Sequence, residues 1–356
     1  MISWVLAAAL VLSGSAAEVA PPDPAQLMAV PPELQARVHA QVIAPGRGQQ
    51  QRLQRLLRFL SDEAPGLAMV YRDNATQSVA EAYLNRQANC VTYTMLFLAL
   101  AQQVGLEAYP QEIDETLEWQ QLDGIVYRSN HVNAGVRVGT HRYSVDVGAG
   151  FVMARHPAHR ISVQRLLAQY YNNHAAMLMT GKRMPTALAY SQVALELDPT
   201  YPTTWSNNGV LRLHDGDADG ARQDYETALK LDSVHAPALF NLVALYQRSG
   251  QRELEQSYRR RLDKVQQADP FHQFLMAAGY ERQGNAALAI RHYQRAIKLQ
   301  GSEHLFHFGL ARSFLLADNR RRAMRALDRA LALAPDPARR SFYQERIAEL
   351  SAEASR

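Results

Sequence analysis

A chain of 356 residues is long enough to form two or three domains with sizeable cores. Hydrophobic residues make up 47% and charged residues 20% of it, which is typical of globular proteins and excludes a largely disordered one. The formal net charge is only +4, so the composition does not call for nucleic acid and we expect no nucleic-acid partner.

The N-terminus has the pattern of a secretory signal. Residues 2–12 form an apolar run that is too short to span a bilayer comfortably, and small residues follow it as far as Ala17. We therefore expect a cleaved signal peptide over 1–17, a secreted or periplasmic location and no stable membrane span after cleavage. An N-terminal segment that stays uncleaved and anchors the chain is the alternative. A proline-rich linker is expected over 18–32.

Helices are expected in the first part of the globular chain. Leucines recur at helical spacing within 34–61. A long apolar helix is predicted to begin at Cys90, because Asn89 is a good N-cap, and to end near Val104, where Gly105 provides a stop.

Cys90 is the only cysteine in the chain. At the first position of a helix, the unpaired N–H groups and the positive end of the helix dipole favour a thiolate, which is the nucleophilic form. A single thiol in an exported protein is exposed to oxidation, so its presence favours a function. A buried structural cysteine is the alternative.

Strands are expected beyond residue 105. Residues 107–113 read as one strand, and residues 131–138 and 142–147 flank a turn as an antiparallel hairpin. In that register His131 faces Gly148 and Asp146 faces Asn133. His131 and Asp146 are then diagonal neighbours on one face. An aspartate there can accept the ring N–H and stabilise the imidazolium.

A cysteine at the start of an apolar helix, then a histidine on one strand and an aspartate on the next, resembles the transglutaminase-like superfamily of papain-type folds. The stretches that carry the resemblance are Asn89–Tyr93, Gly105–Ala108, Asn130–Val132 and Tyr143–Asp146. The resemblance implies an α+β domain over 33–165, with Cys90 as nucleophile, His131 as base and Asp146 as the residue that orients the base. It also implies acyl transfer or hydrolysis at an amide or ester through a thioester.

Other residues are weaker candidates for these roles. His141 falls in the expected turn, and neither Asp114 nor Asp123 is placed in a strand beside His131. The backbone N–H of Cys90 and the side chain of Gln87 are candidates for stabilising an oxyanion.

No metal and no cofactor is expected. The histidine pairs at 156 and 159 and at 304 and 307 each lack a clear third ligand. The chain also contains no glycine-rich loop that would bind phosphates.

From residue 168 the chain repeats every 34 residues without insertion, in units 168–201, 202–235, 236–269, 270–303 and 304–337. Small residues recur at the eighth, twentieth and twenty-seventh positions, which resembles the tetratricopeptide (TPR) repeat, where two helices cross closely. The third unit departs most, with Leu262 at a position that is usually alanine, so we expect a local distortion there. A capping helix is expected within 338–356, with Phe342 and Ile347 facing inward.

The expected fold is thus an α+β papain/transglutaminase-like domain followed by an all-α TPR solenoid. The expected function is that of an exported cysteine enzyme, closer to amide hydrolysis than to crosslinking, whose concave repeat surface recruits a protein or peptide. The alternative is a non-catalytic scaffold that uses the repeats for protein–protein interaction. A third hypothesis keeps catalysis but assigns it to a small amide or a cell-wall peptide.

Overall fold

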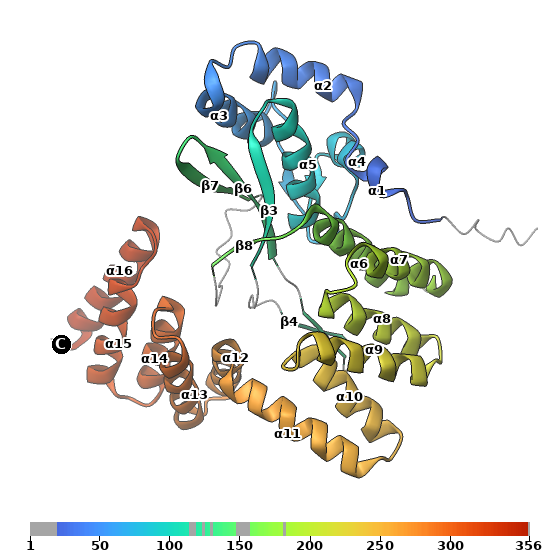
Figure 1. Cartoon of the computed structure of the whole chain (residues 1–356). Coiled ribbons are helices and arrows are strands. Elements are labelled where there is room, and N and C mark those ends of the chain that lie inside the picture. Colours follow the sequence, from blue (N-terminus) through green and yellow to red (C-terminus); the bar gives the residue numbers. More distant parts are fainter. Residues whose placement is uncertain are drawn as a thin grey trace, which may run out of the picture.

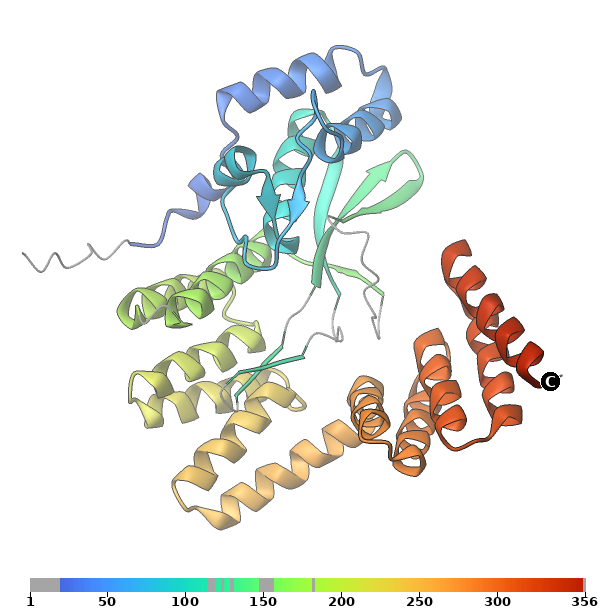
Figure 2. The same cartoon turned by 180° about the vertical axis from the view of Figure 1, so that it is seen from behind.

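The computed structural model describes residues 20–113, 119–122, 125–128, 131–146, 157–180 and 183–354. An α+β domain comes first and a helical solenoid follows it, curving away as an arc (Figures 1 and 2). The expected signal peptide lies outside the described residues, as do Asp114, Asp123, Gly148 and His156. Among the described helices, none has the length and apolarity that a membrane crossing requires.

The helices of the α+β domain surround one long central helix. They are α1 (Pro24–Leu27), α2 (Pro32–Val38), the π-helical turn η1 (His39–Ile43), α3 (Gly48–Ser61), α4 (Val79–Asn85) and α5 (Cys90–Gln103). The helical stretch expected over 34–61 is interrupted, because Pro45 cannot donate the hydrogen bond that would continue the helix.

The proline-rich segment is not a free linker. Leu27 of α1 is buried in the core, and the backbone carbonyl of Pro22 accepts a hydrogen bond from the Tyr171 hydroxyl at 2.5 Å. The prolines set the entry of α1 and α2, each of which has a proline in its first turn. The segment therefore packs on the domain and on the first solenoid helix.

Helix α5 begins at Cys90, as the sequence predicts. Asn89 is the N-cap, and its side-chain oxygen accepts from the backbone N–H of Thr92 at 3.0 Å. The helix stops before Gly105, whose φ of +72° suits a residue without a side chain. Every residue from Val91 to Ala101 is buried, which explains why this helix is apolar on all sides.

The main sheet is antiparallel, with the strand order β7-β6-β3-β8. The strands are β3 (Glu107–Ile113), β6 (His131–Val138), β7 (His141–Val145) and the short edge strand β8 (His159–Arg160). The hairpin prediction is confirmed: Val138 pairs with His141 across the Gly139–Thr140 turn. His141, expected in the turn, is instead the first residue of β7, because a two-residue turn already reverses the chain.

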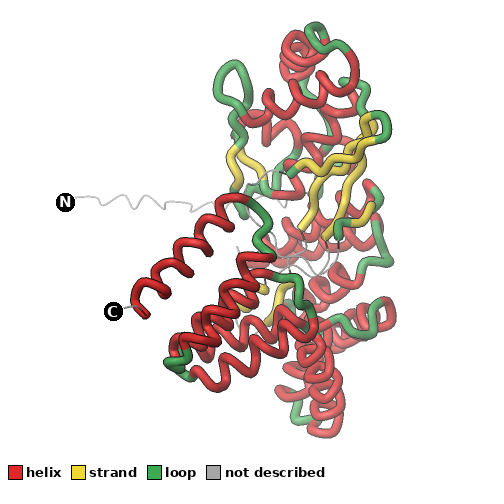
Figure 3. Tube along the Cα trace, turned by 90° about the vertical axis from the view of Figure 1, so that its left-hand side faces the viewer, coloured by secondary structure: helices red, strands yellow, loops and turns green. Residues whose placement is uncertain are grey.

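Two smaller strand pairs complete the β structure. Strands β1 (Val70–Tyr71) and β2 (Gln87–Ala88) are parallel, and β4 (Trp119–Leu122) and β5 (Ile125–Arg128) form an antiparallel pair. Figure 3 shows the main sheet gathered in one part of the molecule and the β4–β5 pair apart from it, among the solenoid helices. Strand β5 lies against helix α10 of the solenoid.

The second part of the chain is an all-α, TPR-like solenoid, which confirms the prediction of helical repeats. Its helices are α6 (Val163–Thr180), α7 (Met184–Leu197), α8 (Pro202–His214), α9 (Ala218–Leu231), α10 (Ala236–Arg248), α11 (Arg252–Ala268), α12 (Pro270–Arg282), α13 (Ala286–Leu299), α14 (His304–Leu316), α15 (Arg320–Ala332) and α16 (Pro337–Ala354). The small residues lie where the helices cross. At Gly209, a Cβ atom would come within 2.6 Å of the Tyr225 ring.

The first solenoid helix belongs to the core of the α+β domain. Helix α6 begins five residues before the predicted repeat frame, and Leu166, Ala168 and Tyr171 are fully buried in the same cluster as α5. A polar network joins the two parts as well. The buried Glu112 carboxylate of β3 accepts from Gln169 at 3.0 Å and from the Tyr201 hydroxyl at 2.8 Å.

The third repeat unit separates two solenoid cores. In α11, Leu262 is the buried residue, whereas the corresponding second helices of the neighbouring units bury several residues each. One apolar cluster ends with α11, and different clusters begin with α12. The distortion expected in the third unit therefore takes the form of a break in the core.

The capping helix α16 begins one residue before the predicted range of 338–356 and uses a different anchor. Tyr343, and not Phe342, is fully buried in α16. The reason is polar: its hydroxyl lies 2.6 Å from the Nδ1 atom of the buried His304. Ile347 is partly buried and packs on the last repeat, as expected.

Candidate active site

The start of α5 is held in place by the loop that precedes α4. The Asn89 side-chain amide donates to the Thr76 hydroxyl at 2.7 Å, and the Thr92 hydroxyl donates to the Ala75 carbonyl at 3.0 Å. Asn89, Thr76 and Thr92 are all buried, so these bonds are shielded from water. They fix the first turn of α5 and with it the position of Cys90, which is itself partly exposed.

His131 contacts both other residues of the predicted triad. Its Nε2 atom lies 2.5 Å from a carboxylate oxygen of Asp146, and Cys90 is close enough to contribute to the raised pKa of the ring. The side chains of His131 and Asp146 are 16% and 28% exposed, so the pair is shielded but open to solvent on one side.

The charge state of His131 follows from these contacts. Burial lowers the pKa of the ring, but the hydrogen bonds to Asp146 and Cys90 outweigh it and raise the pKa to about 10. The ring is therefore protonated at neutral pH, and it can serve as a proton donor while it stabilises negative charge on a neighbouring sulfur.

The hairpin register accounts for this arrangement. Ala134 pairs with Val145, so Asn133 aligns with Asp146 one step further along, as the sequence predicts. Asn133 itself is buried, and its side-chain oxygen has no hydrogen-bond partner within the described part of the chain.

Tyr93 is a neighbour of the site that the sequence analysis missed. Burial, followed by the nearby negative charge of Asp146, raises the pKa of its hydroxyl to about 12, so it stays neutral. The spacing of three residues from Cys90 on a helix places both side chains on one face, and this signal could have identified it.

The other sequence candidates lie apart from this cluster or outside the described residues. His141 and His159 are exposed on β7 and β8. Gln87 is exposed on β2, three residues before Cys90, and its side chain has no hydrogen bond with the described residues.

The structure offers no metal site within the residues that it describes. His307 is buried near the Gly301 carbonyl, with its Nε2 atom at 3.1 Å, and thus has a structural partner.

Comparisons with known proteins give likenesses in fold. Neither a protein-family model nor a curated protein sequence matches the chain. Among solved structures, YrrB, a TPR protein with an unusual peptide-binding site, is 20% identical with a TM-score of 0.27, over 50% of this chain and 92% of that one. PilF of Pseudomonas aeruginosa is 15% identical with a TM-score of 0.30, over 54% and 87%. A MamA protein is 16% identical with a TM-score of 0.27, over 47% and 91%. Likenesses at these values say nothing about function.

Proposed function

We propose that this protein is an exported cysteine enzyme of transglutaminase-like type, and that its solenoid recruits a protein or peptide substrate. The observation that carries the proposal is the contact of one histidine, His131, with both Cys90 and Asp146. A nucleophile beside a base, with the base held by a third group, is the arrangement that acyl transfer requires.

In the proposed reaction, the Cys90 sulfur attacks the carbonyl carbon of an amide. A C–S bond forms and the carbonyl electron pair moves to the oxygen, giving a tetrahedral oxyanion. The oxyanion collapses, the C–N bond breaks, and protonated His131 gives its proton to the departing amine. Water then attacks the thioester, His131 takes a proton from that water, and the C–S bond breaks. Asp146 keeps the ring oriented throughout, and Tyr93 borders the site as a neutral hydroxyl.

A specific observation favours a second candidate, a non-catalytic scaffold. The solenoid is a TPR-like fold, and such folds form extended concave surfaces suited to binding other chains. In that case the solenoid carries the function, and the bonds around Cys90 serve only to hold α5 against the hairpin.

Thiol alkylation separates the two candidates. The mature protein is treated with iodoacetamide across pH 5 to 9, and the labelling rate of Cys90 is followed by mass spectrometry. Rapid labelling at pH 6 that is lost in His131→Ala supports the enzyme. The matched control is His141→Ala, an exposed histidine on the same hairpin, which should label like the wild type. Slow labelling that rises only above about pH 8 and ignores His131→Ala supports the scaffold.

A further inference from the structure

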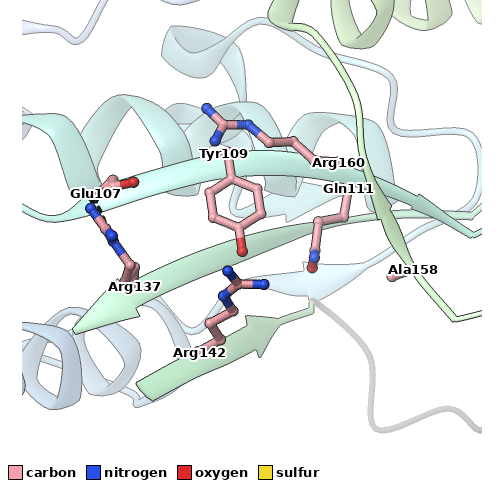
Figure 4. Close-up of a pocket in the computed structure, with 7 residues that line it drawn as sticks. All are labelled: Glu107, Tyr109, Gln111, Arg137, Arg142, Ala158 and Arg160. Atoms are coloured by element: carbon pink, nitrogen blue, oxygen red, sulfur yellow. Dashed lines mark hydrogen bonds and ion pairs between the residues drawn. The ribbon is translucent and has the colours of Figure 1, made fainter. Parts of the chain in front are cut away.

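A pocket of about 320 Å³ lies on the main sheet, on the face that α5 does not cover (Figure 4). Its lining residues are Glu107, Tyr109, Gln111, Arg137, Arg142, Ala158 and Arg160. They come from all four strands or, for Ala158, from the residue before β8. Three arginines face one glutamate, so the pocket has a local charge of +2.

Two of the three arginines have no carboxylate partner among the described residues. Glu107, Arg137 and Arg142 stand side by side across β3, β6 and β7. Glu107 forms an ion pair with Arg137. Arg142, the direct cross-strand neighbour of Arg137, has no carboxylate partner in the described part of the chain. Like charges in this position destabilise a sheet unless an anion lies between them.

The Tyr109 ring lies at the centre of the pocket. The Tyr109 ring lies over Gly135, where a Cβ atom would clash with the ring. The Arg160 guanidinium lies 4.6 Å from the centre of the same ring. Figure 4 shows the Arg142 guanidinium turned toward the hydroxyl end of Tyr109. Arg142 and Arg160 thus lie beside the Tyr109 ring, and their N–H groups can donate hydrogen bonds to a ligand.

The pocket lies on the same face of the sheet as His131. Residues 131, 133, 135 and 137 of β6 alternate onto one face, so His131 and Arg137 share it. Six residues along a strand span about 20 Å, which places Arg137 at that distance from His131. Gln111 pairs with both Asn133 and Arg160, so the near end of the pocket is only about 7 Å along β6 from His131.

We propose that this pocket binds an anionic side chain of a peptide whose scissile amide lies at Cys90. An extended peptide of about six residues spans the distance from His131 to Arg137. Arg142 and Arg160 pair with the anionic group of that side chain. This group is a carboxylate or a phosphoryl group, because each of these two groups accepts paired N–H groups of arginine. This substrate preference rests on the proposed acyl-transfer function.

Peptide binding to an unreactive chain tests the pocket separately from the chemistry. The full mature chain carrying Cys90→Ala is titrated into three fluorescein-labelled hexapeptides, followed by anisotropy. The peptides differ only in their last two residues. Both residues are glutamate in the first peptide, phosphoserine in the second and glutamine in the third. The pocket proposal is supported if either anionic peptide binds about tenfold more tightly than the glutamine peptide. The anionic peptide that binds more tightly then shows whether the pocket prefers a carboxylate or a phosphoryl group.

Variants test whether these arginines supply the preference. Arg142→Ala and Arg160→Ala should each weaken anionic binding about tenfold, and Arg142→Glu should abolish the preference. Arg340→Ala, an exposed arginine of α16, is the matched control and should bind like the parent. Thermal unfolding shows that each variant is folded. Equal binding of all three peptides, or anionic binding unchanged in Arg142→Ala and Arg160→Ala, overturns the pocket proposal whatever the reactivity of Cys90.

Discussion

Two opposing effects act on the pKa of the His131 ring. Burial disfavours its charged form, whereas its bonds to Asp146 and Cys90 favour that form and prevail. The alignment of His131 with Asp146 could be predicted, because a two-residue turn at 139–140 determines which residues of the hairpin face one another. The place of Cys90 beside them was implied only by the family resemblance of the sequence. The arginine pocket could not be predicted, since Arg160 joins the sheet from a two-residue strand that has no detectable periodicity.

The raised pKa of His131 predicts a pH dependence of stability. A group whose pKa rises from 6.5 to about 10 on folding stabilises the protein fully below pH 6.5 and loses that contribution as the pH rises toward 10. The stability advantage of the wild type over His131→Gln should therefore fall between pH 7 and 9.5, by up to about 1.4 kcal/mol per pH unit.

Urea denaturation of both proteins at several pH values measures this difference. His141→Gln, on the same hairpin, should show no such trend. Wild-type and His131→Gln curves that stay parallel from pH 7 to 9.5 would contradict the assignment of a charged His131.

At the scale of elements, α5 and the β6–β7 hairpin position the site, and both could be predicted. Helix α5 has a clear cap and a continuous apolar run, and the hairpin strands alternate over enough residues to give a signal. Strands β1, β2 and β8 have two residues each, which is too short for any pattern. The β3–β8 pairing likewise depends on tertiary packing, because β8 lies far from β3 in the chain.

The cap of α5 should contribute more than an ordinary cap. Asn89→Ala removes the acceptor for the Thr92 N–H and also leaves the buried Thr76 hydroxyl without its donor. We expect a loss of about 2 kcal/mol or more, above the ~1 kcal/mol typical of a cap. Asn285→Ala, which removes the exposed cap of α13, is the matched control and should cost about 1 kcal/mol.

Chemical denaturation measures both losses, and alkylation of Cys90 adds a functional readout. Asn89→Ala should also slow labelling at pH 6, because the first turn of α5 loosens, whereas Asn285→Ala should not. Equal stability losses in the two variants would mean that the Asn89–Thr76 bond adds nothing.

At the scale of the whole molecule, the start of the repeats in the sequence does not coincide with the end of the hydrophobic core of the α+β domain. The 34-residue period predicts the repeats well because it reflects helix crossings within each unit. The period carries no information on what the outer face of the first unit packs against. In the structure, this face packs against the α+β domain. Glu112 and its partners Gln169 and Tyr201 fasten the same junction.

Truncations test where the folding unit ends. Residues 20–269 keep the first two apolar clusters whole, so this fragment should be soluble and melt cooperatively. Residues 20–162 lack α6 and expose the part of the core that Leu166 and Tyr171 complete, so this fragment should aggregate. Size-exclusion chromatography and circular dichroism distinguish the outcomes. A soluble, folded 20–162 fragment would show that the α+β domain does not need the first repeat.

The core break between α11 and α12 has a mechanical consequence. Helices on either side are packed within their own clusters, so bending at this junction disturbs little buried apolar surface. We therefore expect the solenoid to bend more readily at this joint than within either of the two segments that it separates. A partner that bridges them must restrict the joint, which reduces its affinity, while a partner confined to one segment binds without that entropic cost.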